Sequence, residues 1–115
     1  MSGQKLIRVS LGASGTADLF DNQTIRDIGL SGAEVSIRMI SSTVNVVHGL
    51  FAGNDKITDA DTPVSGGGTA GVFPSETQGA FVAFVADPLS KLSMPLRETA
   101  AAAAEVMAVV NVADL

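Results

Sequence analysis

Ala33-Glu34-Val35-Ser36-Ile37-Arg38-Met39-Ile40-Ser41 is the stretch of this sequence that predicts the fold most clearly. Val35, Ile37 and Met39 stand at alternate positions, and the residues between them are polar or charged. A two-residue period places apolar side chains on one face of an extended strand and polar side chains on the other. The β-branched residues favour the same conformation. We therefore predict a strand over residues 33–41 with one buried face.

The flanking segments extend this pattern. Residues 44–51 follow the turn-like Ser41-Ser42-Thr43, and we predict that they form a β-hairpin with residues 33–41. Toward the N-terminus, residues 5–13 are apolar at every second position from Ile7 onward, which predicts another half-buried strand. Residues 18–30 follow no clear period, so we expect a loop with a short turn or strand there.

Residues 52–78 have a different character. This segment is rich in Asp, Gly and Pro and contains the triple glycine at 66–68. Such a composition buries little surface and predicts a long polar loop. Loops of this length in small domains tend to be functional or to become ordered by contact with a neighbour.

Three more strands are expected after the loop. Residues 79–86 are apolar on both parities, which is typical of a strand covered on both faces. Residues 91–99 alternate again, and Pro95 predicts an edge position or a bulge because proline cannot donate to a ladder. Residues 105–112 are rich in valine and predict a final strand, with the alanines at 100–104 as a turn or tight crossing. A C-terminal helix is the alternative, since alanine is the best helix former.

Composition places these elements in one all-β domain. The chain has 115 residues, of which 46% are hydrophobic and 17% charged. About six strands with almost no helical periodicity predict a single small β-sandwich over residues 1–115, jelly-roll-like, with a long Gly-rich loop at about 52–78.

Several functional classes are excluded by what the chain lacks. There is no cysteine, and therefore no disulfide framework, thiolate zinc site or cysteine nucleophile. A net charge of -5 does not provide the basic surface of a nucleic-acid binder. No apolar run approaches the roughly 20 residues of a membrane span, and no secretory signal follows Met1. We expect neither nucleic-acid nor membrane contact.

Candidate chemical groups are few. His48 is the single histidine, and without a Gly-x-Ser-x-Gly elbow we expect it on the solvent face of a strand or in a subunit contact. Asp55, Asp59 and Asp61 are candidate ligands for a hard cation such as Ca²⁺, although a solvated turn is the interpretation we favour. The glycines at 66–71 lack the Gly-Lys-Ser/Thr end of a phosphate loop. We expect no catalytic residue, no cofactor and no small-molecule substrate.

Apolar side chains exceed what one small core readily absorbs, so a protein-binding role is favoured. We expect symmetric self-association, or binding to other subunits, through a set of apolar and loop residues. These interface candidates are Ile40, Val47, Phe51, Gly67, Val72, Phe73, Phe81 and Phe84.

The C-terminal half also carries a resemblance. A Gly-rich loop punctuated by proline leads to Gly79-Ala80-Phe81-Val82-Ala83-Phe84-Val85, then through Asp87-Pro88-Leu89-Ser90-Lys91-Leu92-Ser93-Met94 to a valine-rich end. In style and composition, residues 63–115 resemble small β-sandwich virion proteins of bacteriophages, of the coat, minor-capsid and cement or decoration types. The resemblance implies a homo-oligomeric viral structural protein without cofactor or catalytic residues, assembled in the host cytoplasm and located in the virion.

Three alternatives stay open. A carbohydrate- or Ca²⁺-binding β-sandwich module would use the acidic loop, although the chain lacks the Trp and Tyr rings that usually stack on sugars. A small β-fold hydrolase would need His48. A coat protein of the RNA-phage type would end in helices, so the structure of residues 100–115 discriminates it.

Overall fold

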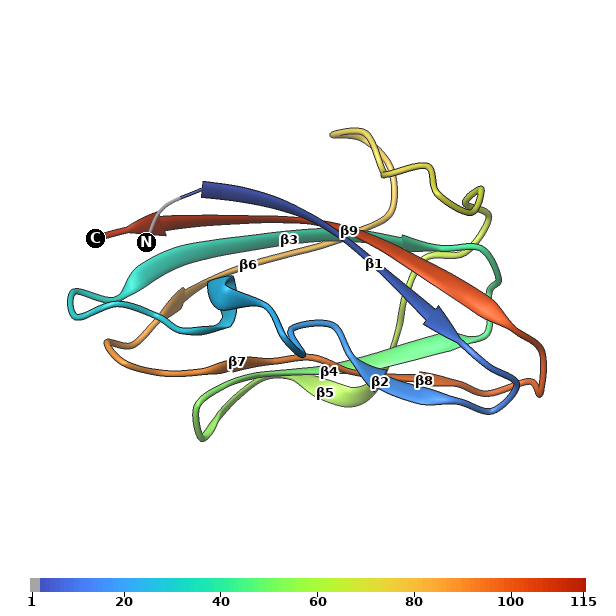
Figure 1. Cartoon of the computed structure of the whole chain (residues 1–115), viewed down its shortest axis with the longest axis horizontal. Helices are drawn as coiled ribbons and strands as arrows, with labels where there is room; N and C mark the ends of the chain where they lie inside the picture. The colour runs from blue at the N-terminus through green and yellow to red at the C-terminus, as the bar shows by residue number, and fades with distance from the viewer. Residues whose placement is uncertain (1–2) are drawn as a thin grey trace.

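Two antiparallel β-sheets face each other in the computed structural model, which describes residues 3–115 (Figure 1). The first sheet has the strand order β1-β9-β3-β6, and the second has the order β2-β8-β4-β5, with β7 also paired to β4. A short 3₁₀ turn, η1, spans Thr24–Arg26. The strands are β1 (Gly3–Leu11), β2 (Thr16–Asp18), β3 (Ala33–Ser41), β4 (Val46–Ala52), β5 (Asp55–Pro63), β6 (Ala80–Ala86), β7 (Leu92–Ser93), β8 (Pro95–Glu98) and β9 (Ala104–Asp114).

The order of pairing defines the topology. β7 and β8 form one strand interrupted at Met94, and the chain then pairs β1 with β9, β2 with β8, β3 with β6 and β4 with β5. These nested pairs make one long antiparallel ribbon that ends in the β4–β5 hairpin. The ribbon folds over so that β9 also pairs with β3, and β8 with β4. This is the connectivity of a jelly roll, and it confirms the predicted small β-sandwich.

The core lies between the two sheets and follows the predicted parity. Val35, Ile37 and Met39 are at most 1% exposed, and they face buried side chains of the second sheet such as Leu50 and Leu96. Each large aliphatic side chain buried in this way contributes about 1.5–3 kcal/mol. The segment between β2 and β3 forms a loop with a 3₁₀ turn, as expected. It supplies four further buried side chains, Leu19, Phe20, Ile25 and Ile28.

A buried carboxylate holds one end of the sandwich together. Glu98 is 1% exposed, and its carboxylate accepts N–H hydrogen bonds from Ser14, Ala100 and Ala102 at 3.0–3.2 Å. Burial raises the pKa of Glu98, but the N–H groups of Ala102, Ala100 and Ser14 outweigh this and leave the pKa below its ordinary value. The bonds join the β1–β2 and β8–β9 connections, both of which cross between the sheets.

The predicted hairpin of residues 33–41 with residues 44–51 is wrong. β3 belongs to the first sheet and β4 to the second, so the two strands face each other across the core. Apart from Ser41 and His48, the inward-facing side chains of both strands are apolar, which favours packing face to face. The connection lacks the two-residue turn that would keep them side by side. Ser41 donates its N–H to Ser65 instead, at 2.8 Å.

The predicted long loop is also shorter than expected. Residues 55–63 form β5, which pairs with β4 through a tight turn in which Gly53 has a φ of +62°. β5 could not be predicted from the sequence, because its side chains are mostly polar and its register with β4 shifts twice. The remaining connection, residues 64–79, is the long Gly-rich loop.

Two expectations for the later strands fail and one holds. β6 is not covered on both faces by the described residues: Phe81 is 56% exposed and Val85 is 60% exposed. The strand that contains Pro95 is not at an edge, because β8 lies between β2 and β4. Pro95 is tolerated as the first residue of β8, after the break at Met94. The strand predicted over residues 105–112 is confirmed as β9, with a turn before it.

Candidate functional site

The outward side of the first sheet is the candidate site, and we call it the outer face. Registers of the four strands align its side chains in rows. The central row contains Gln4, Asn111, Ser36 and Ala83, on β1, β9, β3 and β6 respectively. The rows on either side end on β6, with Phe81 and Val85 respectively. One row contains Leu6, Val109, Arg38 and Phe81, and the other contains Ala113, Glu34 and Val85.

Large apolar side chains on this face are open to solvent. Leu6 is 52% exposed, Phe81 56% and Val85 60%. Two shallow depressions of about 770 and 500 Å³ lie along the face, and both are lined by Gln4 and Asn111. Large exposed apolar side chains around shallow hollows are typical of a protein-binding site.

Arg38 adds the one cation in the middle of the outer face. Its guanidinium lies 4.7 Å from the centre of the Phe81 ring, and its Nη1 donates to the Gln78 carbonyl at 3.0 Å. The cation–π contact and the hydrogen bond hold the guanidinium against the Phe81 ring. The charge therefore lies between Val109 and Phe81 in this row of side chains.

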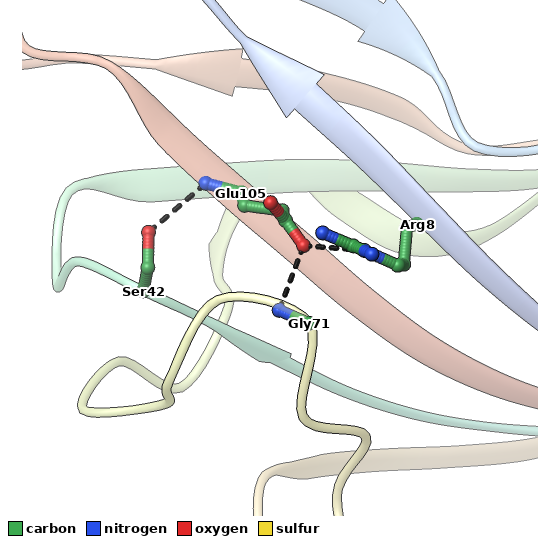
Figure 2. A network of polar contacts seen from close by, with 4 residues as sticks. All are labelled: Arg8, Ser42, Gly71 and Glu105. Carbon is green, nitrogen blue, oxygen red and sulfur yellow. Dashed lines mark hydrogen bonds and ion pairs between the residues drawn. The ribbon is translucent and has the colours of Figure 1, made fainter.

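The loop of residues 64–79 covers the end of the outer face that contains Arg8, Met107 and Ile40. Glu105 on β9 anchors it: its Oε1 accepts hydrogen bonds from Arg8 Nε at 2.7 Å and from the Gly71 N–H at 2.9 Å (Figure 2). The Glu105 N–H donates to Ser42 Oγ at 3.0 Å. The Arg8 hydrogen bond lowers the pKa of Glu105, with further help from Gly71 and against the effect of burial. The same bond raises the pKa of Arg8.

Beneath the loop, this end of the face is closed. Met107 points outward by parity, between Arg8 and Ile40, yet it is fully buried. A Cβ atom on Gly68 would lie 3.1 Å from the Ile40 side chain, so a larger residue there would require the loop or Ile40 to shift. The loop thus divides the outer face into a covered half and an open half that contains β6.

The predicted interface residues do not fall on one surface. Ile40, Phe73 and Phe81 lie at the outer face or line its hollows, and the exposed loop residues Gly67 and Val72 lie in the loop over it. Val47 and Phe51 are half-buried on the second sheet, and Phe84 packs against the core and lines the larger hollow.

Sequence reasoning missed Leu6, Val85 and Val109 as members of this surface. A signal existed for Leu6, because it stands among polar residues on the outward parity of β1. No local signal placed Val109 beside Leu6, since their pairing joins residues from opposite ends of the chain.

The acidic candidates do not converge. Asp59 pairs with Lys56 at 3.1 Å, and Asp61 pairs with Arg97 at 2.5 Å. In residues 3–115 no group of three acidic or histidine side chains has the arrangement of a metal site. The carboxylates on β5 are therefore spread along an edge strand, each beside its own cation or solvent.

His48 is not on the solvent face of its strand, which was the first of the two positions expected for it, the other being a subunit contact. It is 3% exposed, opposite the buried Leu96, and its Nδ1 lies 3.3 Å from the Gly49 carbonyl oxygen. Burial lowers the pKa of His48, against a smaller opposing effect of the Gly49 carbonyl. A hollow of about 350 Å³ is lined by His48, Asp18 and Asp61. Their hydrogen bonds lie elsewhere: Asp18 accepts from Ser93 and two backbone N–H groups, and Asp61 is bound to an arginine.

Comparison with known proteins found no match to a family model, to a curated protein or to a solved structure. Within the described residues, no helix is long and apolar enough to cross a membrane. The functional interpretation therefore depends on the fold and on the outer face.

Proposed function

We propose that this chain is a structural subunit of a protein shell, and specifically a coat or capsid-stabilising subunit of a virion. It acts by binding other subunits, including copies of itself, through the outer face of the first sheet. It is not an enzyme and uses no cofactor. It assembles in the cytoplasm of a host cell and functions in the virion.

The open apolar half of the outer face carries this proposal. Leu6, Phe81 and Val85 lie on one side of one sheet, where a contact with a neighbouring subunit would remove them from water. Burial of apolar surface is the main favourable contribution to association. The jelly roll is a fold of viral capsid and lectin domains, which adds support at the level of fold alone.

The alternatives have less support. A Ca²⁺-binding module would need oxygen ligands that converge, whereas Asp59 and Asp61 pair with separate cations. An RNA-phage coat would end in helices, whereas β9 occupies residues 104–114. A hydrolase would need an available base near a nucleophile, and the hydrogen bond of buried His48 is to the carbonyl of its neighbour Gly49.

Sedimentation velocity and negative-stain electron microscopy of the purified chain test the proposal. We expect particles or regular oligomers larger than a dimer as concentration rises, or co-sedimentation with capsids. Leu6→Lys should weaken this assembly because it places a charge on the outer face. Leu30→Lys is the matched control, since Leu30 is 83% exposed in the connection before β3. A chain that forms no oligomer larger than a dimer at any concentration and does not co-sediment with capsids would contradict the proposal.

A further inference from the structure

The edge of β6 is the feature of the outer face that the proposed function leaves unexplained. β6 is an outermost strand of the first sheet, and in the described residues its backbone hydrogen bonds go to β3 alone. Its other side presents a row of unpaired N–H and C=O groups. Such an edge is a template for another strand, and proteins normally protect it.

The other three outermost strands in residues 3–115 have such protection. β2 is only three residues long. β1 carries Lys5 and Arg8. β5 carries Lys56 and Asp59, ends at Pro63 and is distorted by two register shifts. Short length, charge, proline and bulges are the recognised means of preventing edge-to-edge pairing. β6 has none of them: it is seven residues long and contains only Ala, Phe and Val.

The sequence of β6 is self-complementary about Ala83, because each Phe has a Val at the mirrored position. In an antiparallel pair of two copies centred there, Phe81 of one copy lies opposite Val85 of the other, and Val82 lies opposite Phe84. The strand's terminal alanines also meet. Aromatic and β-branched residues directly opposite each other are favourable cross-strand pairs. Because all these pairs keep the parity of the strand, the outer face and the core face both continue across the join.

We propose that β6 pairs with β6 of a second copy of this chain, antiparallel and with a twofold axis at Ala83. The two first sheets then join into one continuous sheet, and the exposed Phe81 and Val85 of each copy meet across the axis. An isologous contact of this kind closes after two copies. This pairing rests on the proposed function in one respect: within the shell, the β6–β6 contact is the first one to form.

Charge substitutions at the axis test both the edge and its register. Ala83 is exposed, and it faces Ala83 of the other copy in the proposed pair. Ala83→Lys therefore places two like charges opposite each other, and so does Ala83→Glu. We expect each variant to raise the dissociation constant of the dimer by about tenfold. An equimolar mixture of the two variants should recover dimerisation near the wild-type level, because opposite charges then meet.

Sedimentation equilibrium supplies the readout, with the wild-type dimer at twice the 11.7 kDa chain mass. Leu30→Lys is the control, because Leu30 is 83% exposed in the connection before β3 and lies outside β6. It should leave the dimer intact. Circular dichroism verifies that each variant is folded. A monomeric wild type, an unaffected Ala83→Lys variant, or a mixture no tighter than its components would each overturn the inference.

The two proposals fail separately in these measurements. If the chain forms the β6 dimer but does not assemble further and does not bind capsids, the pairing stands and the shell function is contradicted. If the Ala83→Lys variant assembles into particles as well as the wild type does, the shell function stands and the β6 pairing is contradicted. Loss of the dimer in Leu6→Lys would place the contact on the face of the sheet and overturn the edge pairing.

Discussion

β5 and β6 are outermost strands of opposite sheets and follow each other in the chain, yet they present opposite chemistry at their edges. β5 carries four charged side chains, shifts register with β4 and ends at a proline. β6 contains no charge, pairs regularly with β3 and exposes Phe81 and Val85. Charged edge strands are present in both sheets, since β1 of the first sheet carries Lys5 and Arg8. The bare edge of β6 is thus a property of its sequence and not a requirement of the jelly roll.

The largest expected effect concerns how firmly each edge strand is attached to the core. Phe84 on β6 and Ile57 on β5 are both half-buried and packed against the core. We expect Phe84→Ala to lower the free energy of unfolding by about 2–3 kcal/mol, and Ile57→Ala by about 1–2 kcal/mol, because the aromatic ring loses more contacts. Urea denaturation at neutral pH measures both. Equal losses would show that the two strands are held alike and would weaken the contrast.

A smaller effect is expected at the glycines that lead into the two strands. Gly79 has a φ of +77°, and a Cβ there would lie 2.3 Å from the Met39 carbonyl oxygen. Gly53 has a φ of +62°, but its nearest neighbour would be the Ser90 Cβ at 3.4 Å. We expect Gly79→Ala to cost about 2 kcal/mol and Gly53→Ala about 1 kcal/mol, since only the first adds a collision to the backbone strain. Thermal unfolding ranks the two, and the reverse order would contradict this account of how β6 begins.

The smallest expected effect is on how stability depends on pH. It comes from Glu105, whose hydrogen bonds with Arg8 and Gly71 hold the loop before β6. The pKa of Glu105 is lowered from 4.5 by Arg8 and Gly71. A carboxyl with a lowered pKa in the folded state contributes stability above its unfolded pKa, and that contribution is lost as pH falls through the folded value. Glu105→Gln should therefore be less stable than wild type at pH 7, and the two should converge below pH 4.5.

Thermal unfolding from neutral to acidic pH measures this difference between wild type and Glu105→Gln. The buried Glu98 is present in both chains, so its own acid-dependent contribution cancels in the comparison. Glu34→Gln, on the open half of the same face, is the matched control. A difference that persists unchanged in acid would show that the Glu105 charge does not hold the loop.

Strands with a regular apolar parity could be predicted from the sequence. Residues 33–41 and 105–112 have one strong local signal each, and both strands are present. β5 could not be recognised, because an edge strand with bulges buries little and so loses the two-residue period. The partner of each strand was also beyond local reasoning, as the failed hairpin of β3 and β4 demonstrates.

The candidate surface could be predicted only in part. Phe81 was identified because β6 has more apolar side chains than one face of a sheet needs. Leu6 and Val109 joined it only through the pairing of β1 with β9, which brings the two ends of the chain together. His48 was misplaced because a polar side chain on the inner parity of a strand gives no sign of its burial.

By itself, the sequence determined the all-β class, the inward face of the main strands and the composition of β6, because these follow from side-chain period and size. The tertiary structure decided which strands lie at edges, which half of the outer face the loop covers, and that β6 is left unpaired. Those features depend on contacts between residues far apart in the chain, whose free energy no local pattern records.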